Sequence, residues 1–210
     1  MLASTVPMGG CALGKLVGGM AASAERTGTK EVKAKYTGMA DRNFAVIVAA
    51  DRAIQADHPN AVPIITSQMT VILAKQLDGV ASGFLPAEEV LRFQYQRPGW
   101  VAMSPQDIAK ELNVERLVFI DLQEYSLTDP GNPYVWNAEA SGIIGVTETD
   151  AKIVQDFSFR ERVKVRFPDN DSTSAEDIPR ETVEQVLRER FIARSSWLFF
   201  THEEPNAIKF

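Results

Sequence analysis

The sequence predicts a single α/β (α+β) domain built on a mixed β-sheet with helices packed against it. In the first half of the chain, strand patterns alternate with helix patterns, which favours parallel pairing through helical crossovers. In the second half, strand patterns follow one another across short turns, which favours an antiparallel meander. A long helix pattern near the C-terminus completes the fold and is expected to cover the sheet.

The first elements follow from hydrophobic periodicity. Residues 31–36 alternate apolar and charged side chains, as a half-buried strand does. Residues 43–50 (NFAVIVAA) form a continuous apolar run, typical of a strand covered on both faces. The polar stretch 51–59 is expected to be a loop. Asn60 then caps a helix whose apolar residues recur at helical spacing, and Gly79 ends it.

Two further helices are predicted before the meander. Residues 80–85 form a short strand, and Pro86 begins a helix at its first position, where a missing N–H costs little. Ser104 caps a second helix, which Asn113 closes. This stretch therefore supplies the last crossover between the parallel strands.

The meander consists of strands predicted at 116–126, 134–147 and 156–167, followed by a helix from 179 to about 200. The acidic tail after His202 is expected to be exposed. The strongest strands should lie side by side and contribute the most deeply buried residues, which we predict to be Val46, Ile47, Val48, Leu117, Phe119 and Ile120.

Composition excludes several classes of function. The chain has 210 residues, of which 45% are hydrophobic and 24% charged, so it can bury a sizeable core. Its formal net charge of −6 argues against a nucleic-acid partner, which requires a basic face to neutralise phosphates. No apolar run approaches the roughly 18 residues that a membrane-spanning helix needs.

Cysteine and histidine are scarce. The chain has one cysteine, Cys11, and two histidines, His58 and His202, too few for a structural zinc site with four such ligands. A catalytic metal site would require the two histidines to converge from opposite ends of the chain. The sequence therefore predicts no metal site and no cofactor.

Cys11 instead suggests lipid attachment. Gly9 and Gly10 precede it, like the small-residue box of a bacterial lipoprotein signal, although a basic front segment is missing and Pro7 interrupts the apolar stretch. Either the true start lies upstream or the match is chance. The following Gly, Ala and Ser residues are typical of a flexible tether. We therefore expect residues 1–29 to be a signal remnant and tether, and 30–210 to be the domain.

Two groups of residues are candidates for a functional site. Tyr95, Arg97 and Trp100 belong to an aromatic–arginine cluster that is expected either to anchor a partner protein or to be core and structural loop. Asp51, with Asp57 and His58, follows the apolar strand at the end where α/β sheets place ligand sites. The alternative for these three is a solvated loop with capping carboxylates, and we assign no catalytic residue.

Five stretches of the sequence carry a resemblance to known proteins: 93–95 with Pro98 and Trp100, 114–121, 129–133, 165–168 and 197–203. They resemble an uncharacterised family of bacterial lipoproteins. More distantly, a helix followed by a strand and a meander is similar to periplasmic α/β domains of envelope lipoproteins: the curli-secretion channel protein, activators of peptidoglycan synthases and the N-terminal domain of the Tol-system propeller protein.

This resemblance implies an envelope protein that binds another protein, and it supplies no catalytic residues. We therefore predict a non-enzymatic, lipid-anchored periplasmic module that binds or assembles an envelope protein and contacts the membrane only through its lipid. Two alternatives stay open. One is a cytoplasmic structural or regulatory subunit in which Cys11 is incidental, and the other is a small soluble enzyme with a site near Asp51 and His58.

Overall fold

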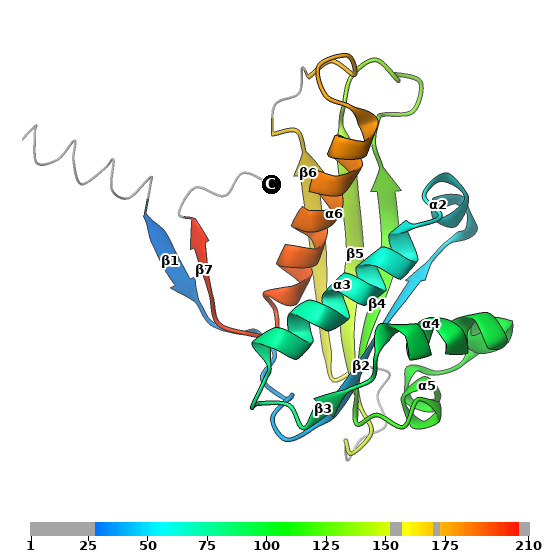
Figure 1. Cartoon of the computed structure of the whole chain (residues 1–210), viewed down its shortest axis with the longest axis vertical. Helices are drawn as coiled ribbons and strands as arrows, with labels where there is room; N and C mark the ends of the chain where they lie inside the picture. Colours follow the sequence, from blue (N-terminus) through cyan, green and yellow to red (C-terminus); the bar gives the residue numbers. More distant parts are fainter. Residues whose placement is uncertain (1–27, 152–156, 170–172, 206–210) are drawn as a thin grey trace, which may run out of the picture. The chain divides into compact units, whose positions relative to one another are not determined.

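The computed structural model describes residues 28–151, 157–169 and 173–205. One compact unit, Ala34–Phe200, contains a five-stranded sheet with helices on both faces (Figure 1). The strands lie in the order β3-β2-β4-β5-β6. β2 is parallel to both β3 and β4, whereas β5 is antiparallel to both of its neighbours, β4 and β6. The predicted mixed sheet is thereby confirmed, and its strands are β2 (Asn43–Ala50), β3 (Gly83–Phe84), β4 (Arg116–Ser126), β5 (Ala138–Glu148) and β6 (Phe159–Phe167).

The helices divide between the two faces of the sheet. The larger core packs α3 and α6 against the face that carries Val46, Val48 and Ile120. The smaller core packs α4, the 3-10 helix η1 and α5 against the opposite face, which carries Ala45 and Ile47. The helical segments are α2 (Arg52–Asp57), α3 (Ala61–Gln76), α4 (Ala87–Gln96), η1 (Pro98–Ala102), α5 (Pro105–Glu111) and α6 (Arg180–Ser196).

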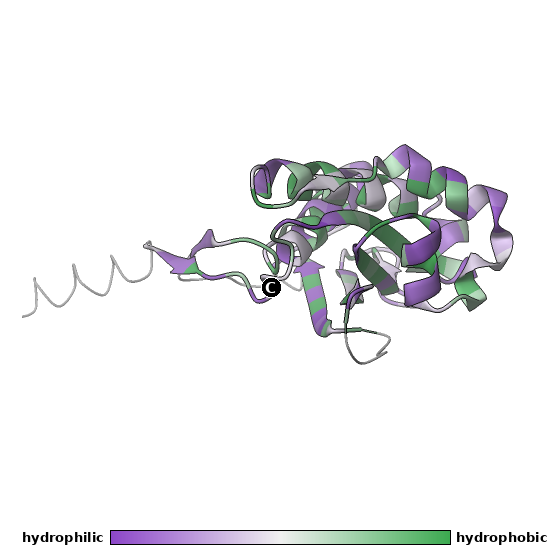
Figure 2. Ribbon diagram, turned by 90° about the horizontal axis from the view of Figure 1, so that it is seen from below, coloured by the Kyte–Doolittle hydropathy of each residue, from purple (hydrophilic) through white to green (hydrophobic). Residues whose placement is uncertain are grey.

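The central pair of strands confirms the apolar-run argument. β2 lies beside β4 in parallel register, with Ile47 opposite Phe119. Five of the six residues predicted to be most buried have no exposed surface, but Phe119 is only partly buried. Its ring stands opposite Gly145, which has no side chain to cover it, and packs against Phe157 at 5.8 Å. In Figure 2 the apolar residues concentrate on the inner strands and on the inward faces of the helices.

Predictions for the segments around residues 51–60 and 80–85 are wrong. Residues 51–59 contain the short helix α2 rather than a loop, because the Asp51 side chain accepts a hydrogen bond from the Ile54 amide at 2.8 Å and caps it. Asn60 precedes α3 but makes no side-chain cap. The strand expected at 80–85 is reduced to Gly83–Phe84.

The ends of other elements also differ. β5 begins at Ala138 rather than near 134, and α6 ends at Ser196, although Leu198 and Phe199 still belong to the core. The first strand covers Thr29–Val32 rather than 31–36.

A separate two-stranded ribbon forms the second unit. β1 (Thr29–Val32) pairs in antiparallel register with β7 (His202–Pro205), and Val32 stands opposite His202. The sequence prediction of an exposed acidic tail missed β7, because its strand partner lies at the other end of the described chain. Within the ribbon, His202 Nε2 lies 3.0 Å from Glu204 Oε1.

Candidate functional site

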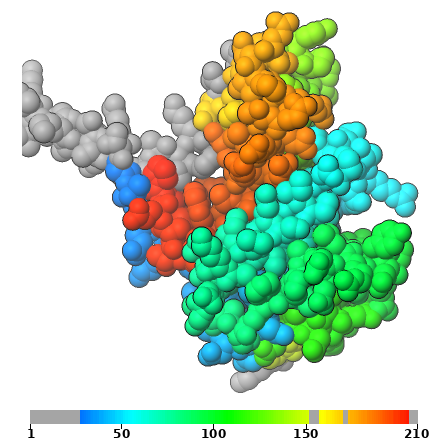
Figure 3. Space-filling view, viewed as in Figure 1, coloured from blue at the N-terminus to red at the C-terminus, as the bar shows by residue number. Residues whose placement is uncertain are grey.

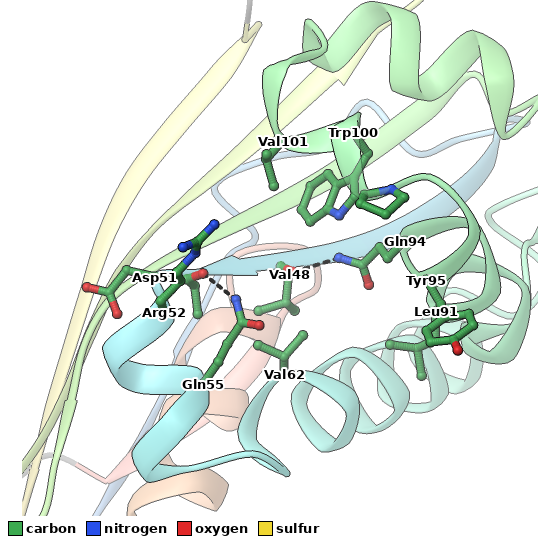
Figure 4. A pocket seen from close by; sticks show the side chains of 12 residues that line it. Val48, Asp51, Arg52, Gln55, Val62, Leu91, Gln94, Tyr95, Trp100 and Val101 are labelled. Atoms are coloured by element: carbon green, nitrogen blue, oxygen red, sulfur yellow. Dashed lines mark hydrogen bonds between the residues drawn. The ribbon is translucent and has the colours of Figure 1, made fainter.

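A cavity of about 670 Å³ opens where β2 ends. In Figure 3 a hollow separates the surface of α2 from that of α4, and Figure 4 shows the cavity at close range. Its walls come from β2, α2, α3, α4 and η1. The lining residues are Val48, Ala50, Asp51, Arg52, Gln55, Val62, Leu91, Gln94, Tyr95, Pro98, Trp100 and Val101.

The cavity exists because the sheet edge is only partly covered. β3 pairs with β2 only at Asn43 and Phe44, and the chain then turns away into α4. Within the part of the chain that the structure describes, the outer edge of β2 beyond Phe44 therefore has no neighbouring strand. Strand carbonyls point alternately to the two edges, so those of Val48 and Ala50 face the cavity side.

Two glutamine side chains cover those carbonyls. Gln94 Nε2 of α4 donates to the Val48 carbonyl at 2.9 Å, and Gln55 Nε2 of α2 donates to the Ala50 carbonyl at 2.6 Å (Figure 4). The other amide atom of Gln94, Oε1, is buried and has no hydrogen-bond partner within the described residues. A buried acceptor without a donor is unfavourable, so this edge is incompletely satisfied.

Aromatic and apolar side chains from two elements also line the cavity, Trp100 and Val101 from η1 and Tyr95 from α4 (Figure 4). Trp100 is buried, whereas Tyr95 is 87% exposed and Val101 is 70% exposed. Pro98 begins η1, which folds the chain back so that Trp100 packs at 6.4 Å from Phe119. Large exposed side chains beside a buried aromatic are the composition of an interaction site more than of a catalytic one.

The charged groups at the mouth of the cavity have unequal roles. Asp51 is committed to the α2 cap through the Ile54 amide. The guanidinium of Arg52 stands above the cavity in Figure 4 and makes no ion pair within the described part of the chain. The mouth therefore carries a guanidinium outside any ion pair of the described residues, beside a carboxylate that caps a helix.

The structure brings together parts of both candidate groups. Tyr95 and Trp100 line the same cavity as Asp51, which the sequence treated as a separate candidate. Arg97 is turned away and forms an ion pair with Glu111. Asp57 also lies outside the cavity lining.

His58 is not part of this cavity either. It is 5% exposed, and its Nδ1 lies 3.3 Å from Glu184 Oε1 on α6. Its ring also meets Tyr125 edge to face at 4.8 Å. Each histidine therefore lies beside a carboxylate of its own surroundings, His58 beside Glu184 and His202 beside Glu204. Burial, followed by the charge of Glu184, raises the pKa of Tyr125 to about 12.

Sequence reasoning missed Arg52, Gln55 and Val101, and it quoted Gln94 only within a resemblance. A glutamine on a helix does not stand out in the hydrophobic pattern of the sequence. Each of these two donates a hydrogen bond to a strand carbonyl, and that carbonyl is available only because β3 ends early. The polar type of Gln94 between two aromatic residues is the one local signal available.

Two other polar clusters lie outside the cavity, and their side chains interact with one another or with the backbone. Arg116 is buried at the opposite end of the sheet and donates to the Gly38 carbonyl at 2.8 Å and to Asp150 at 2.6 Å. On the sheet surface, hydrogen bonding to Glu139 raises the pKa of Glu124. No group of three His, Cys, Asp or Glu residues capable of holding a metal ion occurs in the described ranges.

Cys11 lies outside the described residues, so its lipidation and the tether stay predictions. Among the helices of residues 28–151, 157–169 and 173–205, none has the length and apolar character needed to cross a membrane.

The chain matches no protein-family model and no curated protein sequence. Similar solved structures include lipoprotein GNA1162 from Neisseria meningitidis, with 10% identity, a TM-score of 0.44 and coverage of 70% of this chain and 94% of that one. The PelC dodecamer from Paraburkholderia phytofirmans is also similar, with 10% identity, a TM-score of 0.46 and coverage of 82% of this chain and 97% of that one.

Proposed function

We propose that this protein is a non-enzymatic module of the cell envelope, held at a membrane by lipid on Cys11, and that it binds an envelope protein through the β2 cavity. The observation that carries the binding proposal is that Tyr95, Trp100 and Val101 all line this cavity. Exposed aromatic and apolar anchors beside a buried aromatic are typical of the residues that dominate protein interfaces.

The enzyme alternative receives less support from the same cavity. The carboxylate of Asp51 already caps α2, and His58 packs against Glu184 rather than facing the cavity. General acid–base chemistry needs a titratable group within hydrogen-bond reach of the substrate. The polar groups nearest the cavity floor are the amides of Gln55 and Gln94, which are suited to hydrogen bonding.

Photocrosslinking tests the binding surface. A photoreactive phenylalanine analogue replaces Tyr95 in the native cells, and a defined adduct with one envelope protein is expected. The control places the same analogue at Tyr134, which is 78% exposed and outside the cavity. Equal adducts from both positions, or none from position 95, would contradict the proposal.

A second pair of variants examines the apolar wall. Val101→Glu should reduce the position-95 adduct several-fold because it places a charge on the contact surface. Val71→Glu is the matched control, since Val71 is 66% exposed on α3 and does not line the cavity. A similar loss in both variants would indicate a general effect of the added charge.

Lipid attachment is tested separately. The natural gene, including any upstream start, is expressed with labelled fatty acid, and label on the wild type should disappear in Cys11→Ser. Lipid chains contribute roughly 0.8 kcal/mol per buried methylene, so two or more chains anchor stably. Unlabelled wild type in the soluble cytoplasmic fraction would support the cytoplasmic alternative.

A further inference from the structure

The cavity contains an unpaired strand edge. β2 is central to the sheet at its start, where β3 pairs with Asn43 and Phe44, but it is an edge strand at its end. Among the described residues, the Val48 and Ala50 carbonyls on this edge accept from side-chain amides alone. Because the N–H and C=O of one strand residue point to the same side, the amides of Val48 and Ala50 face this edge as well.

The side-chain amides of Gln55 and Gln94 donate to the strand carbonyls, as the backbone amides of a neighbouring strand would. A side-chain amide carries the same N–H donor and C=O acceptor as a peptide group. Gln94 fills the donor role toward Val48, yet its own Oε1 is buried without a donor. A neighbouring strand would donate to Val48 directly and release the Gln94 amide to water, which removes that unsatisfied acceptor.

We propose that the cavity binds an extended segment of the partner protein, which adds to β2 as a further strand and places an acidic side chain beside Arg52. This inference rests on the proposed function and specifies the chemistry of its partner. Open strand edges recruit peptides in this way, with main-chain hydrogen bonds giving affinity and alternate side chains giving specificity.

The walls and the charge at the mouth define the segment. Alternate side chains of an added strand would point toward Trp100 and Val101 on one side and toward Val62 on the other, all apolar groups. Arg52 has no ion-pair partner in the described chain, so a carboxylate on the segment complements its charge. A cavity of about 670 Å³ lies within the range of ligand sites, about 300–1,000 Å³.

The probe for this test is a phage library of random dodecapeptides selected on the purified full-length protein. Selected peptides should alternate apolar residues and share an Asp or Glu. On binding, hydrogen exchange at the Val48 and Ala50 amides should slow about tenfold or more, because strand addition gives these amides partners. N-methylation of the peptide at alternate residues should weaken binding about tenfold, and methylation between them much less.

Charge reversal tests the role of Arg52. Arg52→Glu should weaken the acidic peptide at least about tenfold, and exchanging the peptide carboxylate for arginine should restore binding. Arg92→Glu is the matched control, since Arg92 is exposed on α4 and does not line the cavity. A loss without rescue, or an equal loss in the control, would overturn the assigned acidic contact.

The outcomes separate this inference from the proposed function. Peptides that bind without slowing exchange at Val48 and Ala50, or a library that yields no binder while position 95 crosslinks normally, overturn strand addition alone. A position-95 variant that gives no specific adduct overturns the proposed binding surface itself.

Discussion

The two ends of β2 differ in how completely their polar groups are hydrogen-bonded. At the amino end, Asn43 and Glu115 exchange hydrogen bonds, with the Glu115 amide donating to Asn43 Oδ1 at 2.8 Å and the Asn43 amide donating to Glu115 Oε2 at 3.2 Å. At the carboxyl end, the Val48 and Ala50 carbonyls depend on glutamine side chains. One end is closed by backbone and paired charges, and the other is open.

The difference shows that charge density alone does not locate a functional site. The amino end has the most charged cluster, but its members pair with one another: Arg116 with Asp150, and Arg42 with Glu115 and Asp150. The carboxyl end has fewer charges, yet within the described residues it retains a buried acceptor without a donor, Gln94 Oε1, and an exposed guanidinium, that of Arg52, outside any ion pair. Under the function that we propose, incomplete pairing rather than charge identifies the surface that would bind a partner.

Breaking the closed end should have the largest effect on stability. Arg116→Met removes a buried guanidinium, which takes the side-chain donor from the Gly38 carbonyl and one of two arginine partners from the exposed Asp150, at a cost of about 3 kcal/mol or more. Urea unfolding with an unchanged m-value measures this cost. Arg52→Met at the open end is the control and should change stability by less than about 0.5 kcal/mol. Similar values for the two variants would contradict the comparison.

β4, which pairs with β2, provides the next comparison, between a fully buried and a partly buried residue of one strand. Leu117 has no exposed surface, so Leu117→Ala should cost about 2–5 kcal/mol. Phe119 is partly exposed beside a second hollow of about 450 Å³, and Phe119→Ala should cost less than Leu117→Ala despite the larger side chain. Chemical denaturation of both variants decides the order, and a larger loss for Phe119 would show that its ring is held more firmly than its exposure indicates.

Alkaline pH should lower the stability of the protein through Tyr125, which lies near the carboxyl end of β4. Burial, with the charge of Glu184, raises its pKa to about 12 in the folded protein, above the ordinary value of about 10. A group whose pKa is raised by folding contributes its full stability below the unfolded pKa and loses it as pH rises toward the folded pKa. The wild type should therefore lose roughly 2 kcal/mol from this group between about pH 10 and 12.

Tyr125→Phe removes that titration. The variant should be about 1 kcal/mol less stable at neutral pH, because the Tyr125 hydroxyl no longer donates to the Glu184 carbonyl, and its stability should fall less steeply above pH 10. Denaturant midpoints measured from pH 8 to 11.5 give both values. An unchanged slope would mean that Tyr125 ionises equally in both states.

The sequence predicts the elements that depend on local pattern and misses those that depend on distant partners. The limits predicted for β4, 116–126, agree with the structure because the strand contains the apolar run 117–120 and continues with Leu122 and Tyr125. α2 was missed because it has only six residues, of which Ile54 alone is buried, and a capping carboxylate resembles loop polarity. β7 was missed because its pairing with β1 joins residues more than 160 positions apart.

The candidate site divides along the same line. Tyr95, Trp100 and Asp51 have residue types that suggest function, and the sequence singled them out. Gln94 meets Val48 across 46 positions, and that contact requires both the early end of β3 and the angle of α4. No periodicity encodes such a contact, so the open edge becomes evident only when the sheet is assembled.

The smallest predicted effect concerns the incomplete satisfaction of that edge. Gln94→Ala removes the donor to the Val48 carbonyl, but it also removes the buried Oε1 that has no partner, so the two effects partly offset each other. We expect a loss of about 0.5–1 kcal/mol, compared with less than about 0.5 kcal/mol for Gln96→Ala, an exposed glutamine two residues away on α4. Urea unfolding of the two variants measures the difference. A loss of about 2 kcal/mol or more at Gln94 would show that the amide is a structural bond comparable to those at the amino end, and that β2 is closed at both ends.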